Sequence, residues 1–516
     1  MTHFSTSKRN TFILLFSIVF IVWCSIFIYR TSFIALDGTR YFSLDDDAMI
    51  SMRYAWNLSH GNGLVWNNGE KVEGFTNFLM TLFMSGFTAL LDKKNAVLGV
   101  QISGIVWLLL TAYFFMKIAE QLVNSRHAYR ETILTLAFIA PLTYYPLLYW
   151  TLKGMETGML ACFIAASIYA TLYFRDRTTP IIGLLLGCAF LTRPDTAVPI
   201  VLILGMRWFL LPANKKITGL ILDSGLIAVF VIGMAIFRFV YYGEFVPNTY
   251  TLKVEGMDTW FRIYENGLVF LWPFLQSISV ALFLGGMLLL LNFQRKHLFF
   301  YGFVVIFTLY QLYMGGDPWE YWRYMAPYVP FLFIVIILGL ANLIRKMSTF
   351  SPKMMLVTLC SAVFLLSNQG GYKELFFIDL PYHTDSNQNN VNIAILLNRI
   401  VDQQASIAVL WGGTIPYYTG RPAIDMLGKN DKYIAALPPD ISGSVSWKGM
   451  KSVPGHNKYD LHYAIVEKQP TYIQVFKWGK QDLSTFVSQY YVPVNVENHT
   501  LWLRRNSPHV FWQSLN

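Results

Sequence analysis

The chain has 516 residues, of which 54% are hydrophobic and 14% are charged, and its mean hydropathy is +0.42. Soluble globular domains carry about 25% charged residues, so this composition excludes an ordinary soluble protein and predicts many apolar helices. The net charge of +10 is divided into basic pairs between the apolar runs. This distribution indicates membrane topology and argues against a nucleic-acid partner.

The first predicted element is the apolar run 11–29, which is long enough for a helix to cross a bilayer. Lys8 and Arg9 before it resemble the start of a signal peptide. The run is longer than the apolar part of a signal peptide, however, and residues 28–30 make a poor cleavage site. We therefore expect an uncleaved membrane helix.

Basic pairs mark the expected cytoplasmic ends of the apolar runs. They are Lys8/Arg9, Arg126/Arg130, Arg175/Arg177, Lys215/Lys216, Arg295/Lys296 and Arg345/Lys346. With these pairs inside, we expect about eleven transmembrane helices, an inner amino terminus and an outer carboxyl terminus. The expected spans are 11–29, 96–119, 131–149, 156–174, 181–192, 196–211, 217–240, 268–292, 298–314, 327–343 and 354–368. A crossing at 75–91 would reverse this topology, so we expect a re-entrant or interfacial helix there.

Three consecutive aspartates, Asp45, Asp46 and Asp47, follow the first apolar run in the expected first outer loop. Ser43 with Asp46 fits a capping box, which predicts a helix from Asp47 to Ser59 on the membrane surface. The simplest interpretation of the acids is a helix cap. One acid is enough for a cap, so we expect at least one of the three to serve catalysis or ligand binding.

The chain changes character near its carboxyl end, where apolar runs shorten and Asn, Pro and Gly become frequent. Residues 406–410 and 472–476 alternate as strands do, and 391–401 has a helical pattern. The sequence therefore predicts a polytopic α-helical membrane protein with a carboxyl-terminal α/β periplasmic domain. The expected organisation is a transmembrane catalytic module at 1–370, its first outer loop at 30–95, and the periplasmic domain at 371–516.

Further charged residues gather in the predicted outer loops. The candidates for one outward-facing cavity, besides the aspartates, are Arg53, Glu73, Arg193, Lys253, Asp317, Glu320 and Arg323. Ionisable groups near membrane depth are costly, and they usually line a cavity or pair with one another. A structural pair such as Arg193 with Asp195 explains single residues, but it does not explain why all of them lie on one side.

Acids beside cations at a membrane surface suit the transfer of a sugar from a lipid phosphate. A carboxylate can accept the proton of an acceptor hydroxyl as a general base. Arginine or lysine can hold the phosphate and stabilise the charge of the leaving group. The lipid chain stays in the bilayer throughout such a reaction.

The stretch DDDAMISMRYAWNLSHGNGLVWNNGEKVEGFTNFLMTL resembles the first outer loop of the GT-C superfamily of polytopic glycosyltransferases. It is most similar to the branch that holds the terminal arabinofuranosyltransferases of mycobacterial cell walls and a bacterial pilin arabinofuranosyltransferase. The segments WTLKGMETG, FLTRPD, YYGEFVPNTYTLK and GGDPWEYWRYMAPYVP also match that branch. Residues 412–428 resemble a segment of its carboxyl-terminal periplasmic domain.

The resemblance implies a GT-C fold and an inverting displacement at the anomeric carbon of the donor sugar. The role of the base falls on Asp46 or Asp47, with Asp46 slightly favoured as the first acid of the matching pair. Asp45 is an addition to a two-acid motif and leaves this assignment open. The candidates for contacts with the donor phosphate are Arg193, Lys253 and Arg323, and Arg323 lies in the matching WRY segment. The residues expected to bind the acceptor in the periplasmic domain are Tyr417, Arg421 and Asp425.

No cofactor is expected, although three adjacent acids leave Mg²⁺ or Mn²⁺ open. The four cysteines fall inside apolar runs without paired spacings, so no metal ligands are expected among them. The implied donor is a polyprenyl-phosphate-linked sugar, with a pentose such as arabinofuranose suggested by the branch. The acceptor is a periplasmic glycan, lipopolysaccharide or a pilin-like protein.

The expected location is a bacterial inner membrane, with membrane lipids as partners and the site facing the periplasm. Two other classes of protein are alternatives to an enzyme. A transporter or flippase of lipid-linked sugars would place its key charges at the bilayer midplane, whereas these charges gather at the outer boundary. A non-catalytic scaffold for envelope assembly would not need acids and cations clustered together.

Overall fold

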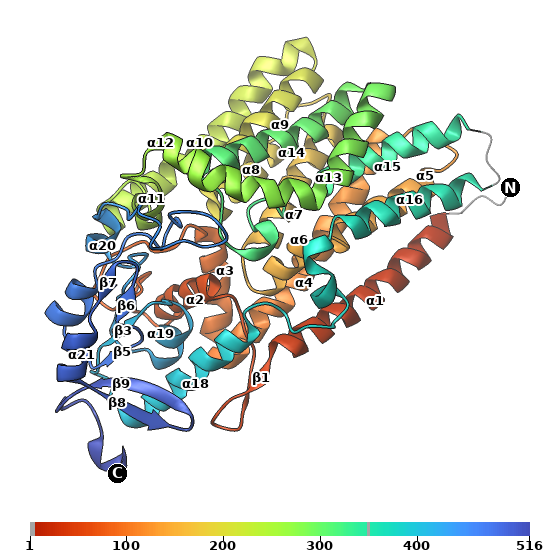
Figure 1. The fold of residues 1–516 in the computed structure, drawn as a ribbon. Helices are drawn as coiled ribbons and strands as arrows, with labels where there is room; N and C mark the ends of the chain where they lie inside the picture. Colours follow the sequence, from red (N-terminus) through yellow and green to blue (C-terminus); the bar gives the residue numbers. More distant parts are fainter. Residues whose placement is uncertain (1–5, 348–350, 516) are drawn as a thin grey trace.

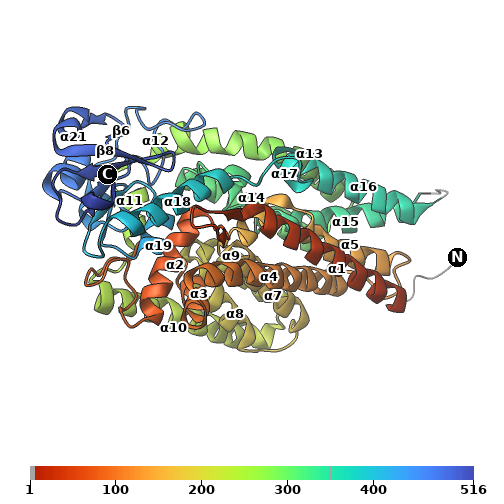
Figure 2. The same ribbon diagram turned by 90° about the horizontal axis from the view of Figure 1, so that it is seen from below.

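The apolar runs of the sequence fold into a long helical bundle. The structure is a computed structural model that describes residues 6–347 and 351–515. The bundle occupies one end of an elongated molecule, and a smaller α/β unit covers the other end (Figures 1 and 2). The chain begins at the far end of the bundle and finishes in the α/β unit, so the two termini lie at opposite ends of the molecule.

A helix lies at each of the eleven positions predicted for a span. The helices of the bundle and its loops are α1 (Thr6–Thr31), α2 (Asp46–Ser59), α3 (Phe78–Leu90), α4 (Lys93–Leu122), α5 (Arg130–Leu142), α6 (Tyr145–Leu152), α7 (Thr157–Tyr173), α8 (Ile181–Thr192), α9 (Ala197–Leu210), α10 (Lys216–Tyr242), α11 (Asn248–Val254), α12 (Thr259–Phe261), α13 (Leu268–Leu291), α14 (Arg295–Met314), α15 (Pro330–Arg345), α16 (Pro352–Leu366) and α17 (Tyr372–Leu375).

Within residues 6–347 and 351–515, five helices are long and apolar enough to cross a membrane, or up to seven if each of two bent pairs counts as one span. The bent pairs are α5 with α6, at 51°, and α16 with the following short helices, at 63°. Helices α3, α7, α8 and α15 are apolar but shorter. The number of eleven crossings therefore stays a prediction.

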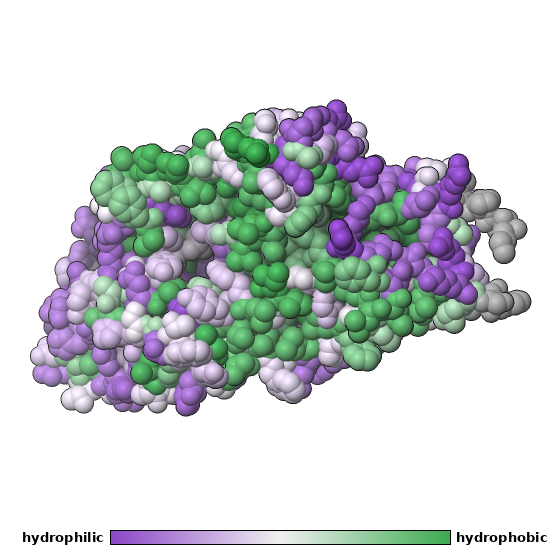
Figure 3. Space-filling view, turned by 90° about the horizontal axis from the view of Figure 1, so that it is seen from above, coloured by the Kyte–Doolittle hydropathy of each residue, from purple (hydrophilic) through white to green (hydrophobic). Residues whose placement is uncertain are grey.

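The outer surface of the molecule has the distribution of side chains that a membrane protein needs. Figure 3 shows an apolar belt across the middle of one face, with hydrophilic residues gathered toward both ends. Large hydrophobic side chains are exposed along α1, α10 and α13. Lipid can cover such side chains, whereas water cannot do so favourably.

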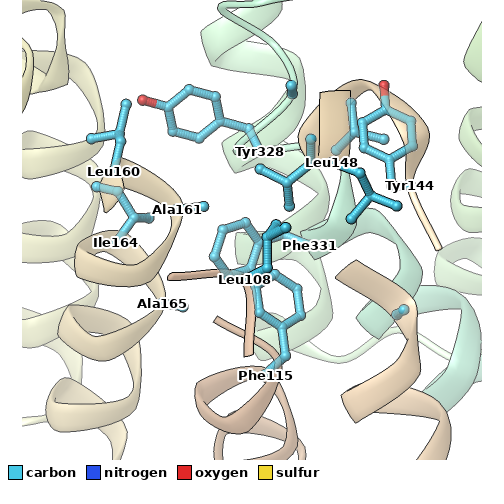
Figure 4. Packing of buried hydrophobic residues seen from close by; sticks show 14 of the residues in the cluster. Leu108, Phe115, Tyr144, Leu148, Leu160, Ala161, Ile164, Ala165, Tyr328 and Phe331 are labelled. Carbon is cyan, nitrogen blue, oxygen red and sulfur yellow. The ribbon is translucent and has the colours of Figure 1, made fainter. Parts of the chain in front are cut away.

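The core of the bundle lies where α4, α6, α7 and α15 meet. Figure 4 shows Phe115 of α4 against Phe331 of α15, with Leu160 and Ile164 of α7 beside them. The Phe115 and Phe331 ring centroids are 4.6 Å apart, and both side chains are fully buried. Small residues such as Ala161 let α7 approach α4 closely, which is typical of helices packed in membranes.

The first outer loop places two helices next to the bundle. A short hairpin of β1 (Phe33–Ile34) and β2 (Arg40–Tyr41) leads to α2, which packs on α3. The helix predicted from Asp47 begins at Asp46, and its N-cap is Asp45 rather than Ser43. The prediction that it lies on a surface is wrong, because residues 48–55 are all buried and the helix packs on α3 and α19 (Thr414–Thr419). The Asp45 carboxylate accepts the backbone N–H of Asp47, whereas the Ser43 hydroxyl accepts a hydrogen bond from Lys153.

The carboxyl-terminal unit contains a five-stranded sheet in the order β4-β3-β5-β9-β8. Its elements, with the small hairpin β6–β7, are α18 (Thr384–Ile400), β3 (Ile407–Val409), α19 (Thr414–Thr419), β4 (Ala423–Asp425), α20 (Lys432–Ala436), β5 (Tyr472–Ile473), β6 (Lys477–Trp478), β7 (Gln481–Asp482), α21 (Ser484–Tyr490), β8 (Tyr491–Val496) and β9 (His499–Arg504). Strand β3 runs parallel to β4 and β5, and β9 runs antiparallel to β5 and β8. The strands predicted at 406–410 and 472–476 are present but shorter, and the helix predicted at 391–401 begins earlier, at Thr384.

Candidate active site

The three aspartates at the start of α2 turn toward three different parts of the molecule. Asp45 lies at the N-cap, and Asp46 and Asp47 form the first turn. Consecutive residues of a helix point in directions about 100° apart, so neighbouring acids cannot share one partner easily. Each carboxylate therefore has a contact set of its own.

Asp45 contacts the segment that leads from the bundle into the carboxyl-terminal unit. Its Oδ2 lies 3.0 Å from the Nδ1 of His383. Burial raises the pKa of Asp45, but the hydrogen bond and charge of His383 outweigh burial and lower it. Asp45 thus fixes both the start of α2 and the start of α18.

Asp46 binds the amino-terminal end of α19. Its two oxygens accept the backbone N–H groups of Gly413, at 3.0 Å, and Thr414, at 2.9 Å. A carboxylate is favourable at a helix start, where backbone N–H groups lack partners. Burial nevertheless raises the pKa of Asp46 to about 6, and the neighbouring acids add to this effect. Both oxygens of this carboxylate are engaged with the backbone.

Asp47 is partly exposed and forms ion pairs with two cations. Its Oδ2 accepts a hydrogen bond from Arg323 Nη1 at 2.8 Å, and its Oδ1 accepts one from Lys429 Nζ. Burial raises the pKa of Asp47, but the charges of Lys429, Arg323 and Lys253 outweigh burial and hold it well below its usual range. Asp47 is therefore ionised and accessible at neutral pH.

Arg323 is buried and gathers polar groups around its guanidinium. Its Nη2 donates to the Tyr324 hydroxyl at 3.0 Å, and its Nε lies 3.2 Å from Asp317 in an ion pair whose angle is poor for a hydrogen bond. The guanidinium also lies over the Trp150 ring, 5.4 Å from its centroid. These contacts fix the planar fork that suits a phosphate or carboxylate.

Two other predicted phosphate ligands differ in how far their charge is already neutralised. Arg193 forms ion pairs with Glu156, at 2.6 Å, and Asp195, at 2.9 Å. Lys253 forms no ion pair with any residue in 6–347 or 351–515, and its ammonium donates only a long hydrogen bond of 3.5 Å to Tyr324. Lys253 can consequently bind an added anion more readily than Arg193 can.

Two cavities meet at Asp47. The first, which we call the Arg323 cavity, has a volume of about 420 Å³, and its charged and polar lining includes Asp47, Arg193, Lys253, Asp317, Arg323, Tyr324 and Lys429. The second, which we call the tryptophan cavity, has a volume of about 320 Å³, and its aromatic lining consists of Trp319, Tyr382, His383, Trp411, Trp447 and His456. Asp47, Ile50 and Lys429 line both cavities.

Aromatic rings of the tryptophan cavity pack edge to face and join the bundle to the carboxyl-terminal unit. The Trp319 ring lies 5.2 Å from Trp447 and 5.5 Å from His456. Burial and the nearby charge of Lys429 lower the pKa of His456 to about 3, so this imidazole is neutral at physiological pH. Asp425 of β4 is the predicted acceptor residue that lines this cavity.

Five predicted site residues lie outside the linings of both cavities, because other parts of the protein use their polar groups. Glu73 pairs with Arg238, and Glu320 pairs with Lys448. Arg53 donates to Trp66 O, Asn67 and Arg421 O, and Arg421 donates to Val401 O, Asp402 O and Asn398. Tyr417 donates to Lys93 O. Their contacts are those of residues that hold the loops in place.

Lys429 is a central contact that the sequence did not single out. It directly follows residues 412–428, the segment that resembles the periplasmic domain of the superfamily, and this position was an available signal. Burial lowers the pKa of Lys429, but the charge and hydrogen bond of Asp47 outweigh burial and raise it. The tryptophans at 319, 411 and 447 likewise come together only in the fold.

The three aspartates do not converge on a point that could hold a metal ion. Asp45 faces His383, Asp46 faces backbone N–H groups, and Asp47 faces two cations. Within residues 6–347 and 351–515 there is no group of three or more His, Cys, Asp or Glu residues arranged to hold a metal. The dependence on a divalent ion stays untested.

Similarity to other proteins covers both parts of the chain. A family described as a domain of unknown function (DUF8728) matches residues 380–511. A terminal beta-(1->2)-arabinofuranosyltransferase of Mycobacterium tuberculosis (strain ATCC 25618 / H37Rv) is 24% identical in an alignment of 260 positions that covers 46% of this chain and 40% of the relative. The match thus spans less than half the length of that relative.

Solved structures align with most of the chain. ArnT from Cupriavidus metallidurans bound to undecaprenyl phosphate has a TM-score of 0.50 at 11% identity, covering 82% of this chain and 86% of ArnT. The Archaeoglobus fulgidus oligosaccharyltransferase has a TM-score of 0.48 at 10% identity, covering 99% of this chain and 75% of that chain. The resemblance predicted from the sequence segments is confirmed: the chain is similar to GT-C glycosyltransferases, with an arabinofuranosyltransferase among its relatives and the fold of ArnT.

Proposed function

We propose that this protein is an inverting glycosyltransferase that moves a sugar from a polyprenyl-phosphate donor to an acceptor hydroxyl at the outer face of a bacterial inner membrane. The observation that carries the proposal is the position of Asp47, an ionised carboxylate at the junction of a cationic cavity and an aromatic one. The ArnT structure of the same fold was solved with undecaprenyl phosphate, which is the kind of lipid phosphate that the proposed donor becomes when its sugar is transferred.

The donor phosphate occupies the Arg323 cavity in this proposal. Arg323 offers a planar fork of donors, and Lys253 offers a charge that no carboxylate neutralises among the described residues. Val246 and Tyr250 line the same cavity and are themselves partly exposed at the molecular surface. Such side chains suit the first isoprene units of a lipid tail whose remainder lies in the bilayer.

Asp47 is the proposed base. An acceptor hydroxyl attacks the anomeric carbon, the bond from that carbon to the phosphate oxygen breaks, and the electron pair leaves with the phosphate. The hydroxyl proton passes to Asp47. In the free site, Arg323 and Lys429 neutralise this carboxylate and make it a weak base. A bound phosphate competes for both cations, which raises the proton affinity of Asp47 when the donor is in place.

The acceptor enters from the tryptophan cavity. Aromatic rings offer apolar faces to the C–H bonds of a sugar, and the polar groups at the edges fix its orientation. Asp47 lines this cavity together with Lys429, so an acceptor hydroxyl in the cavity can reach the base. A glycan, lipopolysaccharide or glycosylated pilin-like protein fits this requirement, and the relative from M. tuberculosis favours arabinofuranose as the transferred sugar.

A reconstituted transfer assay tests the proposal. Purified protein in lipid nanodiscs is incubated with extracted envelope fractions and either a labelled polyprenyl-monophosphate sugar or the matching UDP- or GDP-sugar. We expect label to move only from the lipid donor, and Asp47→Asn to abolish transfer while the protein inserts normally. Efficient transfer from a nucleotide sugar without lipid would refute both the donor and the membrane side.

A further inference from the structure

The turn that precedes Arg323 has an unfavourable backbone conformation. Tyr321, with φ of 59°, and Trp322, with φ of 42°, both lie in the left-handed region, although neither is glycine. Residues with a Cβ atom avoid this region, and two in succession persist only where the surroundings hold them. The turn therefore needs a restraint, and the structure contains one.

Glu374 supplies that restraint from α17. The Tyr321 hydroxyl donates to its Oε1 at 2.5 Å, and the Tyr145 hydroxyl donates to its Oε2 at 2.5 Å. The backbone N–H of Tyr382 donates to the same Oε2 at 3.2 Å. Glu374 forms no ion pair with any residue in 6–347 or 351–515, so its carboxylate is held by these neutral donors. We call these four residues the Glu374 clamp.

The clamp is connected to the candidate site at both ends. Tyr321 is two residues before Arg323, and Tyr382 is adjacent to His383, which contacts Asp45. On the other side of the turn, Trp150 Nε1 donates to the backbone oxygen of Glu320 at 3.2 Å. The segment that carries Arg323 is thus fixed through a side chain on one side and through its backbone on the other.

We infer that Glu374 is a positioning residue: by holding Tyr321 in its left-handed turn, it directs the Arg323 guanidinium toward Asp47 and the donor phosphate. The inference rests on the proposed function, because it takes Arg323 as a phosphate ligand. Without the carboxylate, the turn can relax into a right-handed conformation, and the direction in which residue 323 leaves the backbone changes. Glu374 itself does not line either cavity.

Binding of undecaprenyl phosphate to the full-length protein in nanodiscs tests the clamp without requiring turnover. We expect Glu374→Gln and Tyr321→Phe each to raise the Kd by about 10- to 100-fold, because a small displacement of the Arg323 charge weakens its contact with the phosphate. Tyr372→Phe is the matched control, since it removes a phenol of α17 that donates to Leu365 O at 2.6 Å, outside the clamp. Its Kd should equal that of the wild type.

A double-mutant cycle separates positioning from general destabilisation. If Glu374 acts through Arg323, Glu374→Gln should change the Kd by less than about twofold when it is added to Arg323→Ala. An equal loss in both backgrounds would overturn the inference, as would unchanged binding by both Glu374→Gln and Tyr321→Phe. Tyr321→Phe removes a single oxygen from the same contact, so it tests the inference even if Glu374→Gln misfolds. Absence of binding by the wild type would instead refute the proposed donor.

Discussion

Replacing Arg323 with lysine tests whether a planar guanidinium is needed at the donor phosphate. The residue makes three contacts in the free site: Nη1 to Asp47 at 2.8 Å, Nη2 to Tyr324 at 3.0 Å, and Nε to Asp317 at 3.2 Å. A lysine ammonium is a compact charge and can occupy one of these positions but not all three.

The size of the effect follows from the contacts that lysine cannot make. A guanidinium can donate two hydrogen bonds to the phosphate, whereas an ammonium at the same place can replace one of them. A hydrogen bond to a charged group contributes about 1.5–3 kcal/mol, so losing one decreases kcat/KM for the donor by about 10- to 100-fold. Loss of a contact made in the ground state raises KM, and loss of one that strengthens as charge develops on the leaving phosphate lowers kcat.

Initial rates with a labelled polyprenyl-monophosphate sugar measure this change. Arg207→Lys is the matched control, because Arg207 is an equally buried arginine that binds Asp223 and two backbone oxygens away from both cavities. It should lower thermal stability and leave the donor KM unchanged. If folded Arg323→Lys keeps a donor kcat/KM within about threefold of the wild type, Arg323 does not bind the phosphate, and the reasoning fails.

Four further outcomes are expected at the aspartates. Asp47→Asn should reduce transfer by about 10²–10⁴-fold, measured by turnover of labelled donor, whereas Asp46→Asn should retain far more activity. Lys429→Gln should raise the pH at which transfer reaches half its maximum, because it removes one of the cations that lower the pKa of Asp47. The pKa of Asp46 is raised to about 6 in the folded protein, so the folded state binds a proton more tightly than the unfolded state does. As pH falls through about 6, the melting temperature of the wild type should therefore rise relative to that of Asp46→Asn. EDTA should leave transfer unchanged, and a loss restored by Mg²⁺ would contradict the contacts that occupy Asp45, Asp46 and Asp47.

Hydropathy and basic pairs were enough to locate the helices, because an apolar run of sufficient length has few alternatives to a helix. They were not enough to count the crossings, since α8 and α15 are short and α5 continues into α6 with a sharp bend. Strands β3 and β5 lie within the two segments whose alternating sequence pattern predicted strands. The β8–β9 hairpin was missed, although Glu497 and Asn498 form its tight turn with positive φ angles.

The sequence was enough to predict many residues of the site, but not which of them contact one another. The outer acids and cations could be listed from the expected topology, and Asp47, Arg323 and Lys253 do line one cavity. The contact between Asp47 and Lys429 joins positions 382 residues apart, and no local pattern predicts which helix faces which loop over that distance. The division of roles among the three aspartates depends on the docking of the carboxyl-terminal unit on α2, because His383, the start of α19 and Lys429 each contact a different aspartate.

That docking has a consequence for how the protein is made. The first outer loop leaves the ribosome early in synthesis, but the backbone groups that bind Asp46 and the lysine that binds Asp47 come from residues 413–429. A nascent chain that ends before residue 429 carries the whole set of aspartates and lacks one of the two cations that bind Asp47. The candidate site is therefore completed late, after the helices of the bundle have been synthesised, and a translation product that stops before residue 429 lacks the complete site.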